Sequence, residues 1–366
     1  MPGVGRLFGI VGVLAAWLAV AAVVTAAPIA GNYFGNTWAH TDQPVATGQI
    51  SRTWMWGPTA NTPALFEPYA ESPNDMRQVQ YFDKTRMEVT HPDGDASSIW
   101  YVTNGLLAEE LITGRLQLGD NTFEQHDPAQ VNVAGDANDP NGPTYATFNP
   151  LMAFGAVPNG WNITQTVDRA GVVGSDDALS SFGVTAVDVA VPTTHNVASV
   201  FWDFMNSSGT VFDNGSYGND KLFANPFYAT GYPLTEAYWT NVLVGGVQTQ
   251  VLVQVFERRV LTYTPSNSDG WKVEAGNVGL HYYTWRYTQL GEQATTDPNP
   301  PANWSQPSSG TPPTSTPPTD SGDKNCSDFA THQQAQDYFV SHGGSPTNNF
   351  DGLDADHNGI ACESLP

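Results

Sequence analysis

The sequence predicts a mainly β duplicated domain with short helices, then a Pro/Ser/Thr-rich linker and a small disulfide-stapled module. Over about residues 31–290, short β-branched and aromatic runs are bounded by Gly, Pro, Asn and Asp at close intervals, and helical periodicity is nearly absent. Residues 291–322 change abruptly to Pro, Ser, Thr and Gly, a composition that keeps a spacer extended. The two cysteines of the chain bracket the segment that follows, so 323–366 is expected to be a separate module.

Residues 1–27 have the pattern of a signal peptide. Arg6 supplies a single positive charge, residues 7–24 are apolar apart from glycines, and small residues follow up to Ala27. This pattern predicts export with cleavage near Ala26 or Ala27, and a retained membrane anchor is the alternative. Both interpretations place the remaining chain outside the cytoplasm, secreted or associated with the cell envelope.

The chain carries 13 basic and 36 acidic residues, for a net charge of −23. A basic footprint for nucleic acid is absent, so nucleic acid is excluded as a class of partner. Strong acidity favours solubility and attracts cations, but it carries no information about the fold. The motifs HExxH, GxSxG and GxxxxGK[ST] are also absent, so the sequence shows none of these catalytic signatures.

Two segments of the large region match position by position. Residues 79–84 (VQYFDK) and 253–258 (VQVFER) lie 174 positions apart. Each is followed by a proline, a tryptophan and an asparagine in the same order, namely Pro92, Trp100 and Asn104 in one case and Pro265, Trp271 and Asn277 in the other. Duplication is the simplest explanation, with one copy in residues 31–150 and a second in residues 151–290.

Asp83 and Glu257 occupy equivalent positions in the two copies. Two carboxylates in an aromatic cleft can perform the acid/base chemistry of a glycosidase, which makes an extracellular hydrolase the alternative function. Equivalent places in two copies are more typical of a scaffold, so we assign no catalytic residue. The hydrolase interpretation requires two carboxylates about 5 to 10 Å apart across an aromatic-lined cleft.

Three local patterns give further expectations for the large region. Residues 241–248 place two glycines between apolar runs, which predicts a tight hairpin. Residues 197–206 carry bulky side chains on one side and predict a short helix. The aromatic run at residues 281–287 predicts a closing strand.

The closing run of the chain has the spacing of a calcium loop. Asp354, Asp356 and Asn358 stand at the first, third and fifth positions before a glycine at the sixth. Such loops place short carboxylates or amides at alternate positions around a glycine turn. Ile360 would add its backbone carbonyl, and Glu363 is the nearest carboxylate to the place of the bidentate glutamate in an EF-hand. These five residues are the expected Ca²⁺ ligands, and an Asp/Gly-rich turn without an ion is the alternative.

Cys326 and Cys362 are most simply one disulfide in an exported protein. Closing a loop of about 36 residues removes roughly 4 kcal/mol of unfolded-state entropy in the chain-entropy model. That contribution is large for a module of about 45 residues, which can bury little apolar surface. We therefore expect the disulfide and the bound ion together to stabilise the module in place of a large hydrophobic core.

One helix is expected between the cysteines. Thr331 and Gln334 have the spacing of a capping box, in which each side chain satisfies a free amide at the helix start. Ala335, Tyr338 and Phe339 then recur at spacings of three and four. An amphipathic helix is therefore expected to lead into the metal loop.

Residues 323–366 resemble the Excalibur (extracellular calcium-binding region) domain of bacterial surface proteins. The matching parts are residues 325–329 (NCSDF), 342–344 (HGG) and 354–363 (DADHNGIACE). The family pattern usually has a third Asp where this chain has Asn358, which lowers the expected charge of the site. The resemblance implies an extracellular calcium-binding module.

The large region has a weaker resemblance. Residues 231–236 (GYPLTE) and 254–258 (QVFER) are similar in order to the LGFP-type repeats of bacterial envelope proteins, and the whole region resembles exported Chloroflexota proteins without an assigned activity. This resemblance implies a β-rich repeat module that associates with the cell wall. We therefore expect a secreted or wall-associated calcium-binding protein whose β-rich domain binds an envelope polymer or partner, such as cell-wall polysaccharide or peptidoglycan.

Overall fold

The computed structural model describes residues 27–296, 324–329, 335, 339, 352–355, 361 and 362. The chain divides into two compact units, Met1–Ser309 and Gly310–Pro366. The expected signal segment and nearly all of the expected linker lie outside the described residues. Within the parts that are described, no helix combines the length and the apolarity that a membrane span requires.

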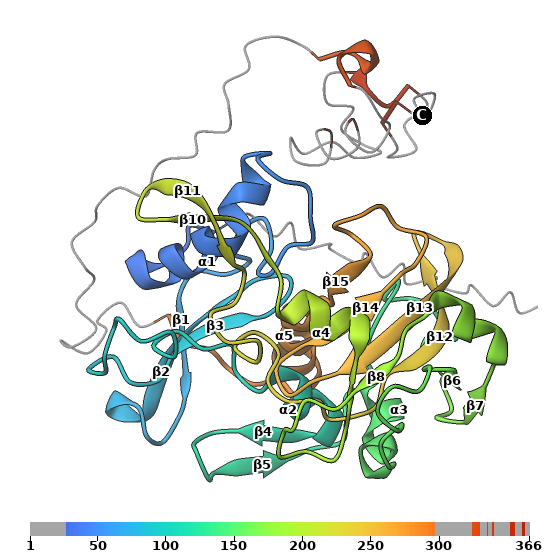
Figure 1. The fold of residues 1–366 in the computed structure, drawn as a ribbon. Helices are drawn as coiled ribbons and strands as arrows, with labels where there is room; N and C mark the ends of the chain where they lie inside the picture. Colours follow the sequence, from blue (N-terminus) through green and yellow to red (C-terminus); the bar gives the residue numbers. More distant parts are fainter. Residues whose placement is uncertain are drawn as a thin grey trace, which may run out of the picture. The chain divides into compact units, whose positions relative to one another are not determined.

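Short strands are the commonest regular elements of the large unit (Figure 1). One antiparallel sheet contains β1 (Leu65–Pro68), β2 (Met76–Tyr81) and β3 (Arg86–Val89) in that order. A six-stranded sheet has the order β15-β14-β13-β12-β6-β7, with bounds Val273–Ala275, Val260–Tyr263, Val247–Val255, Tyr238–Val244, Gln165–Val167 and Val173–Ser175. The remaining strands pair two by two: β4 (Arg115–Gln117) with β5 (Phe123–Gln125), β8 (Ala186–Val187) with β9 (Val197–Ala198), and β10 (Ser208–Asp213) with β11 (Ser216–Lys221). The expectation of a mostly β unit with a few short helices is confirmed.

The hairpin predicted at residues 241–248 is present. β12 and β13 pair from Tyr238 opposite Val253 to Val244 opposite Val247, and two glycines make the turn. Gly245 and Gly246 have φ values of 56° and 78°. A two-residue hairpin turn of this type needs positive φ at both central positions, which glycine adopts without steric cost.

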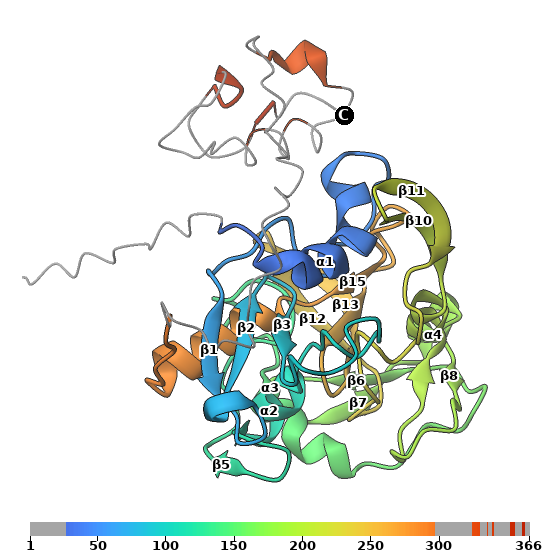
Figure 2. The same cartoon turned by 90° about the vertical axis from the view of Figure 1, so that its left-hand side faces the viewer.

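The helices are short except for the first. In the large unit they are α1 (Gly31–Ala46), α2 (Leu107–Thr113), α3 (Tyr145–Phe148), α4 (Ser199–Met205) and α5 (Val278–Tyr283). Short 3-10 turns lie at Pro73–Asp75 between β1 and β2, at Asn149–Ala153 after α3, and at Asp177–Phe182 between β7 and β8. α4 confirms the helix expected within residues 197–206. α1, which packs against β10 (Figure 2), was not anticipated.

The sequence of α1 shows no apolar periodicity because some of the side chains that it buries are polar. Two of its buried side chains, Thr41 and Asp42, are polar. The Asp42 carboxylate accepts hydrogen bonds from the backbone N–H groups of Met55, Trp56 and Gly57 at 2.7 to 3.2 Å. The helix is therefore held by a buried carboxylate as well as by apolar contacts, and its pattern does not repeat every three to four residues.

The closing strand expected at residues 281–287 is wrong. The chain there is helical, first as α5 and then as a π-helical turn over Thr284–Gln289. Val278, Tyr282 and Trp285 are buried at spacings of four and three, which is the period of a helix. The burial of one helical face overrides the β preference of the aromatic residues.

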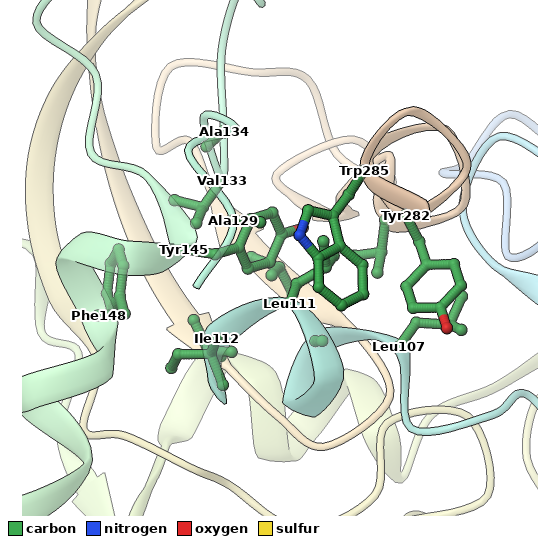
Figure 3. Packing of buried hydrophobic residues seen from close by; sticks show 14 of the residues in the cluster. Leu107, Leu111, Ile112, Ala129, Val133, Ala134, Tyr145, Phe148, Tyr282 and Trp285 are labelled. Atoms are coloured by element: carbon green, nitrogen blue, oxygen red, sulfur yellow. The ribbon is translucent and has the colours of Figure 1, made fainter. Parts of the chain in front are cut away.

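The largest core lies between these elements (Figure 3). Leu107, Leu111 and Ile112 of α2 pack with Tyr282 and Trp285 of the C-terminal helical segment. The same cluster takes in residues from about 65 to 285, so early and late parts of the large unit bury each other. A close-packed core of this kind is sensitive to any change in volume.

The matched segments of the sequence have matched hydrogen bonds. Gln80 in β2 accepts through its side-chain oxygen from the N–H of Ala30, directly before α1, and Gln254 in β13 accepts from the N–H of Ala198, directly before α4. Each amide nitrogen also donates to two backbone carbonyls, those of Pro28 and Thr62 for the first glutamine and of Asn196 and Thr235 for the second. Each glutamine is fully buried and ties a helix start to a strand.

The end of each matched segment accepts a hydrogen bond from a helix that lies in the other half of the large unit's sequence. Leu280 of α5 donates its N–H to the carbonyl of Asp83 at 3.2 Å, although α5 follows the second segment. Glu109 of α2 donates its N–H to the carbonyl of Glu257 at 2.9 Å, although α2 follows the first. Free N–H groups at a helix start need acceptors, and here each helix finds one in the other half of the unit.

A buried carboxylate joins the first sheet to the C-terminal helical segment. Glu67 of β1 lies 2.8 Å from Arg86, 3.0 Å from Arg286 and 3.8 Å from Arg77. Burial alone would raise the pKa of Glu67, but the three guanidinium groups outweigh it and lower the pKa to about 2. Tyr81 also donates its hydroxyl to this carboxylate at 2.6 Å.

Gln254→Leu should destabilise the large unit by about 3 kcal/mol, because it leaves buried backbone groups without partners. Urea unfolding followed by tryptophan fluorescence measures the change. Gln248→Leu, at an exposed position of the same strand, is the matched control and should change stability by less than about 0.5 kcal/mol. Equal effects of the two substitutions would contradict the structural role of Gln254.

The lowered pKa of Glu67 gives stability that is present above about pH 4.5 and is lost as the pH falls toward 2. The shift corresponds to about 3 kcal/mol. Glu67→Gln should lower stability at pH 7 by about 3 to 5 kcal/mol and flatten the acid part of the profile, as measured by urea unfolding from pH 7 to pH 2. Glu124→Gln, at an exposed position, should keep the wild-type profile, and an unchanged profile in Glu67→Gln would refute the assignment.

Candidate metal site

The described residues of the small unit form a hydrophobic cluster around a disulfide. Cys326 and Cys362 are bonded to each other, as the sequence predicted. Ala335 and Phe339, one helical turn apart, are helical and fully buried, which fits the expected apolar face. The cluster is completed by Leu353, Ala361 and Cys362, with Phe329 and Cys326 at its edge. The capping-box residues Thr331 and Gln334, and Tyr338 of the expected helical face, lie outside the described residues.

The segment that carries four of the five predicted ligands, all except Glu363, is closed at both ends. Leu353, directly before Asp354, accepts a hydrogen bond at 2.8 Å through its carbonyl from the N–H of Cys362. Cys362 is also joined covalently to Cys326. One backbone hydrogen bond and one disulfide therefore meet at the same residue, and fixing the ends of a loop lowers the entropy cost of gathering its ligands.

Leu353 and Ala361 are structural residues of the candidate site that the sequence does not single out. Both are buried in the small cluster and stand on either side of the acidic run. Their signal in the sequence is weak, because a leucine and an alanine beside a charged loop are common. Their contribution is to anchor the loop in apolar surroundings on each side.

Asp354 is the predicted ligand that falls among the described residues, and it is 0 % exposed. Burying a carboxylate is costly unless hydrogen bonds, cations or a metal compensate it. Asp356, Asn358, Ile360 and Glu363 lie outside the described residues. For that reason the described part of the chain contains no group of three His, Cys, Asp or Glu side chains that could hold a metal.

The chemistry of the donor set nevertheless fits a hard divalent cation. Carboxylates, an amide and a backbone carbonyl are the oxygen ligands that Ca²⁺ takes, whereas Zn²⁺ sites draw on Cys and His. Both cysteines are consumed by the disulfide and are not free to bind a soft metal. The buried Asp354, the first of the predicted ligands, directly follows Leu353, which bonds to Cys362.

A disulfide-stapled apolar cluster beside a sequence rich in Asp and Asn side chains fits the class of small extracellular calcium-binding modules. The particular module is shown by comparison with known families: residues 323–363 match the family model of the Excalibur calcium-binding domain. This range holds both cysteines and every predicted ligand through Glu363. No curated protein and no solved structure matches the chain significantly. The resemblance of the large region to LGFP-type repeats stays a prediction.

Asp83 and Glu257 lie in equivalent turns of the large unit and have local partners. The Asp83 carboxylate accepts from the side-chain amide of Asn61 at 2.8 Å. The Glu257 carboxylate accepts from the backbone N–H of Tyr232 at 2.9 Å. Neither carboxylate lines the cavity of about 780 Å³ beside Trp285 or the cavity of about 260 Å³ beside α1. These contacts hold turns together and give the hydrolase alternative no support.

Replacing both cysteines, as Cys326→Ser with Cys362→Ser, should raise the Kd for Ca²⁺ by about tenfold or more. The reason is that the loop then loses its covalent end constraint, while the hydrogen bond between Leu353 and Cys362 stays. Calorimetric titration of the full chain with CaCl₂ measures the change. Wild-type affinity in the double variant would show that the disulfide does not prepare the loop.

Proposed function

We propose that this chain is a secreted or cell-wall-associated protein whose small unit binds one Ca²⁺ ion. The single observation that carries the proposal is the fully buried Asp354 at the closed end of the loop, within the segment that matches the Excalibur calcium-binding domain. The expected signal segment at residues 1–27 and the disulfide support an extracellular location, because disulfides persist in oxidising compartments.

In this proposal the ligands divide the work by chemistry. Asp354 and Asp356 supply carboxylate oxygens, Asn358 an amide oxygen, Ile360 its backbone carbonyl, and Glu363 a further carboxylate. Three carboxylates and two neutral oxygens give an affinity at the weak extracellular end, about 10⁻⁴ to 10⁻³ M. The ion then has a structural role: it neutralises the acidic run and completes a module whose apolar cluster is small.

For the large unit we propose a binding role toward an envelope polymer or partner, with cell-wall polysaccharide or peptidoglycan as the first candidates. Origin by duplication, with copies at residues 31–150 and 151–290, is supported by the matched hydrogen bonds of Gln80 and Gln254. Residues 291–322 act as the spacer that carries the calcium module. We assign no catalytic residue to either copy.

Calorimetric titration of the full chain with CaCl₂ tests the metal site. The wild type should bind one equivalent with a Kd of about 10⁻⁴ to 10⁻³ M. Asp354→Ala should abolish the heat of binding, because it removes the buried carboxylate at the first loop position. Asp351→Ala removes the same charge three residues earlier and is the matched control, which should bind as the wild type does.

Absence of binding heat at millimolar calcium would remove the metal assignment. Equal losses in Asp354→Ala and Asp351→Ala would reduce it to a general attraction of cations by an acidic chain. The role of the large unit is tested separately, by co-sedimentation of residues 27–296 with isolated cell walls and soluble glycans. Recovery of that unit only in the supernatant would contradict a wall-binding role and leave the calcium site unaffected.

A further inference from the structure

A cavity of about 260 Å³ opens in the large unit beside α1. Its walls come from α1 and the segment after it, from the segment between β3 and α2, and from the segment that follows β11. Arg259, between β13 and β14, completes the lining. Five aromatic side chains line it: Tyr33, Trp56, Tyr101, Phe223 and Tyr228. Met55, Ile99, Val102, Leu222 and three alanines add apolar wall beside the polar side chains of Asn36, Thr37, Thr41 and Ser98, so the cavity suits a flat apolar body that carries a polar group.

The charge of this cavity is opposite to that of the protein. Acidic residues outnumber basic ones by 36 to 13 in the chain, yet no Asp or Glu lines the cavity. The lining side chains that can carry charge are His40 and Arg259. His40 is already engaged, because its Nδ1 lies 2.9 Å from the carboxylate of Asp213. Arg259 therefore decides the charge that an occupant meets.

Arg259 is a buried cation that pairs with no carboxylate within the described part of the chain. Its guanidinium donates to the carbonyls of Ala229 and Met55 and to the side-chain oxygen of Asn104, all of them neutral acceptors. Trp56 lies beneath the guanidinium, 5.1 Å from ring centre to Arg259 Cζ. A buried charge without a contacting counter-ion is unusual, since burial normally requires pairing.

Asp42, the carboxylate that attracts Arg259, already accepts other hydrogen bonds. Asp42 attracts Arg259 at longer range, but its own carboxylate accepts three backbone N–H groups beside α1. Burial accordingly lowers the pKa of Arg259 to about 10, with Asp42 opposing the shift. The positive charge is retained at neutral pH and lies at the wall of a partly enclosed aromatic cavity, where electrostatic attraction is stronger than in bulk water.

The volume limits the size of an occupant. At about 30 Å³ for each water-sized atom, the cavity accepts roughly nine non-hydrogen atoms. A benzene ring with one carboxylate has that size. Aromatic walls favour a ring in stacked or edge-to-face contact, and a guanidinium favours a carboxylate over other small anions that lack its planar shape.

We propose that this cavity is a binding site for a small aromatic monocarboxylate, with its ring among Tyr33, Tyr101 and Tyr228 and its carboxylate directed toward Arg259. The site lies in the large unit and goes beyond the calcium-binding role, on which it does not depend. It gives the large unit a small-molecule ligand as well as the polymer proposed above.

The test is calorimetric titration of the full chain with benzoate, benzamide and 2-naphthoate. Benzoate should bind with a Kd below about 1 mM, and benzamide, which has the same shape without the charge, should bind at least about tenfold more weakly. 2-Naphthoate should also lose affinity, because its second ring exceeds the volume. Failure of benzoate to bind at about 10 mM, or equal binding of benzamide, would overturn the proposal.

A substitution at the mouth locates the binding. Ala224 is exposed and lines the cavity, so Ala224→Trp should block entry without removing a buried contact and abolish benzoate binding. Ala170→Trp, at an exposed position that does not line the cavity, is the matched control and should bind as the wild type does. Benzoate binding that survives Ala224→Trp unchanged would place the ligand elsewhere and overturn the assignment. Loss of binding in both variants would overturn it as well, because the effect would not be local.

Discussion

The large unit depends on one buried carboxylate. Glu67 stands in the first strand of the unit and is held by Arg77 of β2, by Arg86 of β3 and by Arg286 of the last helical segment. A buried ion cluster contributes little net stability compared with apolar residues of equal volume, but it tolerates no missing partner. Its effect is therefore on specificity: the cluster forms only when strands β1 to β3 and the segment after α5 have all arrived. Through Arg286, the C-terminal helical segment therefore helps to hold the first sheet together.

The Glu67 cluster also explains why α5 and α2 each bond to a turn in the other half of the large unit. α5 must reach the first sheet so that Arg286 can meet Glu67, and on the way its N-terminal N–H groups meet the turn at Asp83. α2 makes the corresponding contact with the turn at Glu257. The two helices then pack on each other in the largest core. Long-range contacts of this kind have high contact order, which slows folding because distant segments must meet before they stabilise one another.

Sequence patterns predicted the features that depend on neighbours in the chain. The glycine pair at 245 and 246 sets its own turn, and the cysteine pair needs no third residue. α1 was missed because it buries Thr41 and Asp42, whose partners come from elsewhere in the fold. The aromatic residues of segment 281–287 favour a strand by local preference, but the face that the segment buries makes it helical. The Glu67 cluster joins residues 219 positions apart, and no local pattern announces it. In the predicted metal loop the spacing of the ligands is a local pattern that the sequence shows. The burial of Leu353 and Ala361 beside it depends on the fold and leaves no such pattern.

Cys362 has two duties in the small unit, since its N–H closes the loop onto Leu353 and its sulfur ties that closure to Cys326. A freshly synthesised polypeptide in a reducing compartment lacks the covalent half of this closure, and it acquires that half where thiols are oxidised. In the proposed function, oxidation of the two thiols therefore precedes capture of the ion, and the thiol chemistry of the surroundings sets the moment at which the acidic run becomes a receptor for calcium.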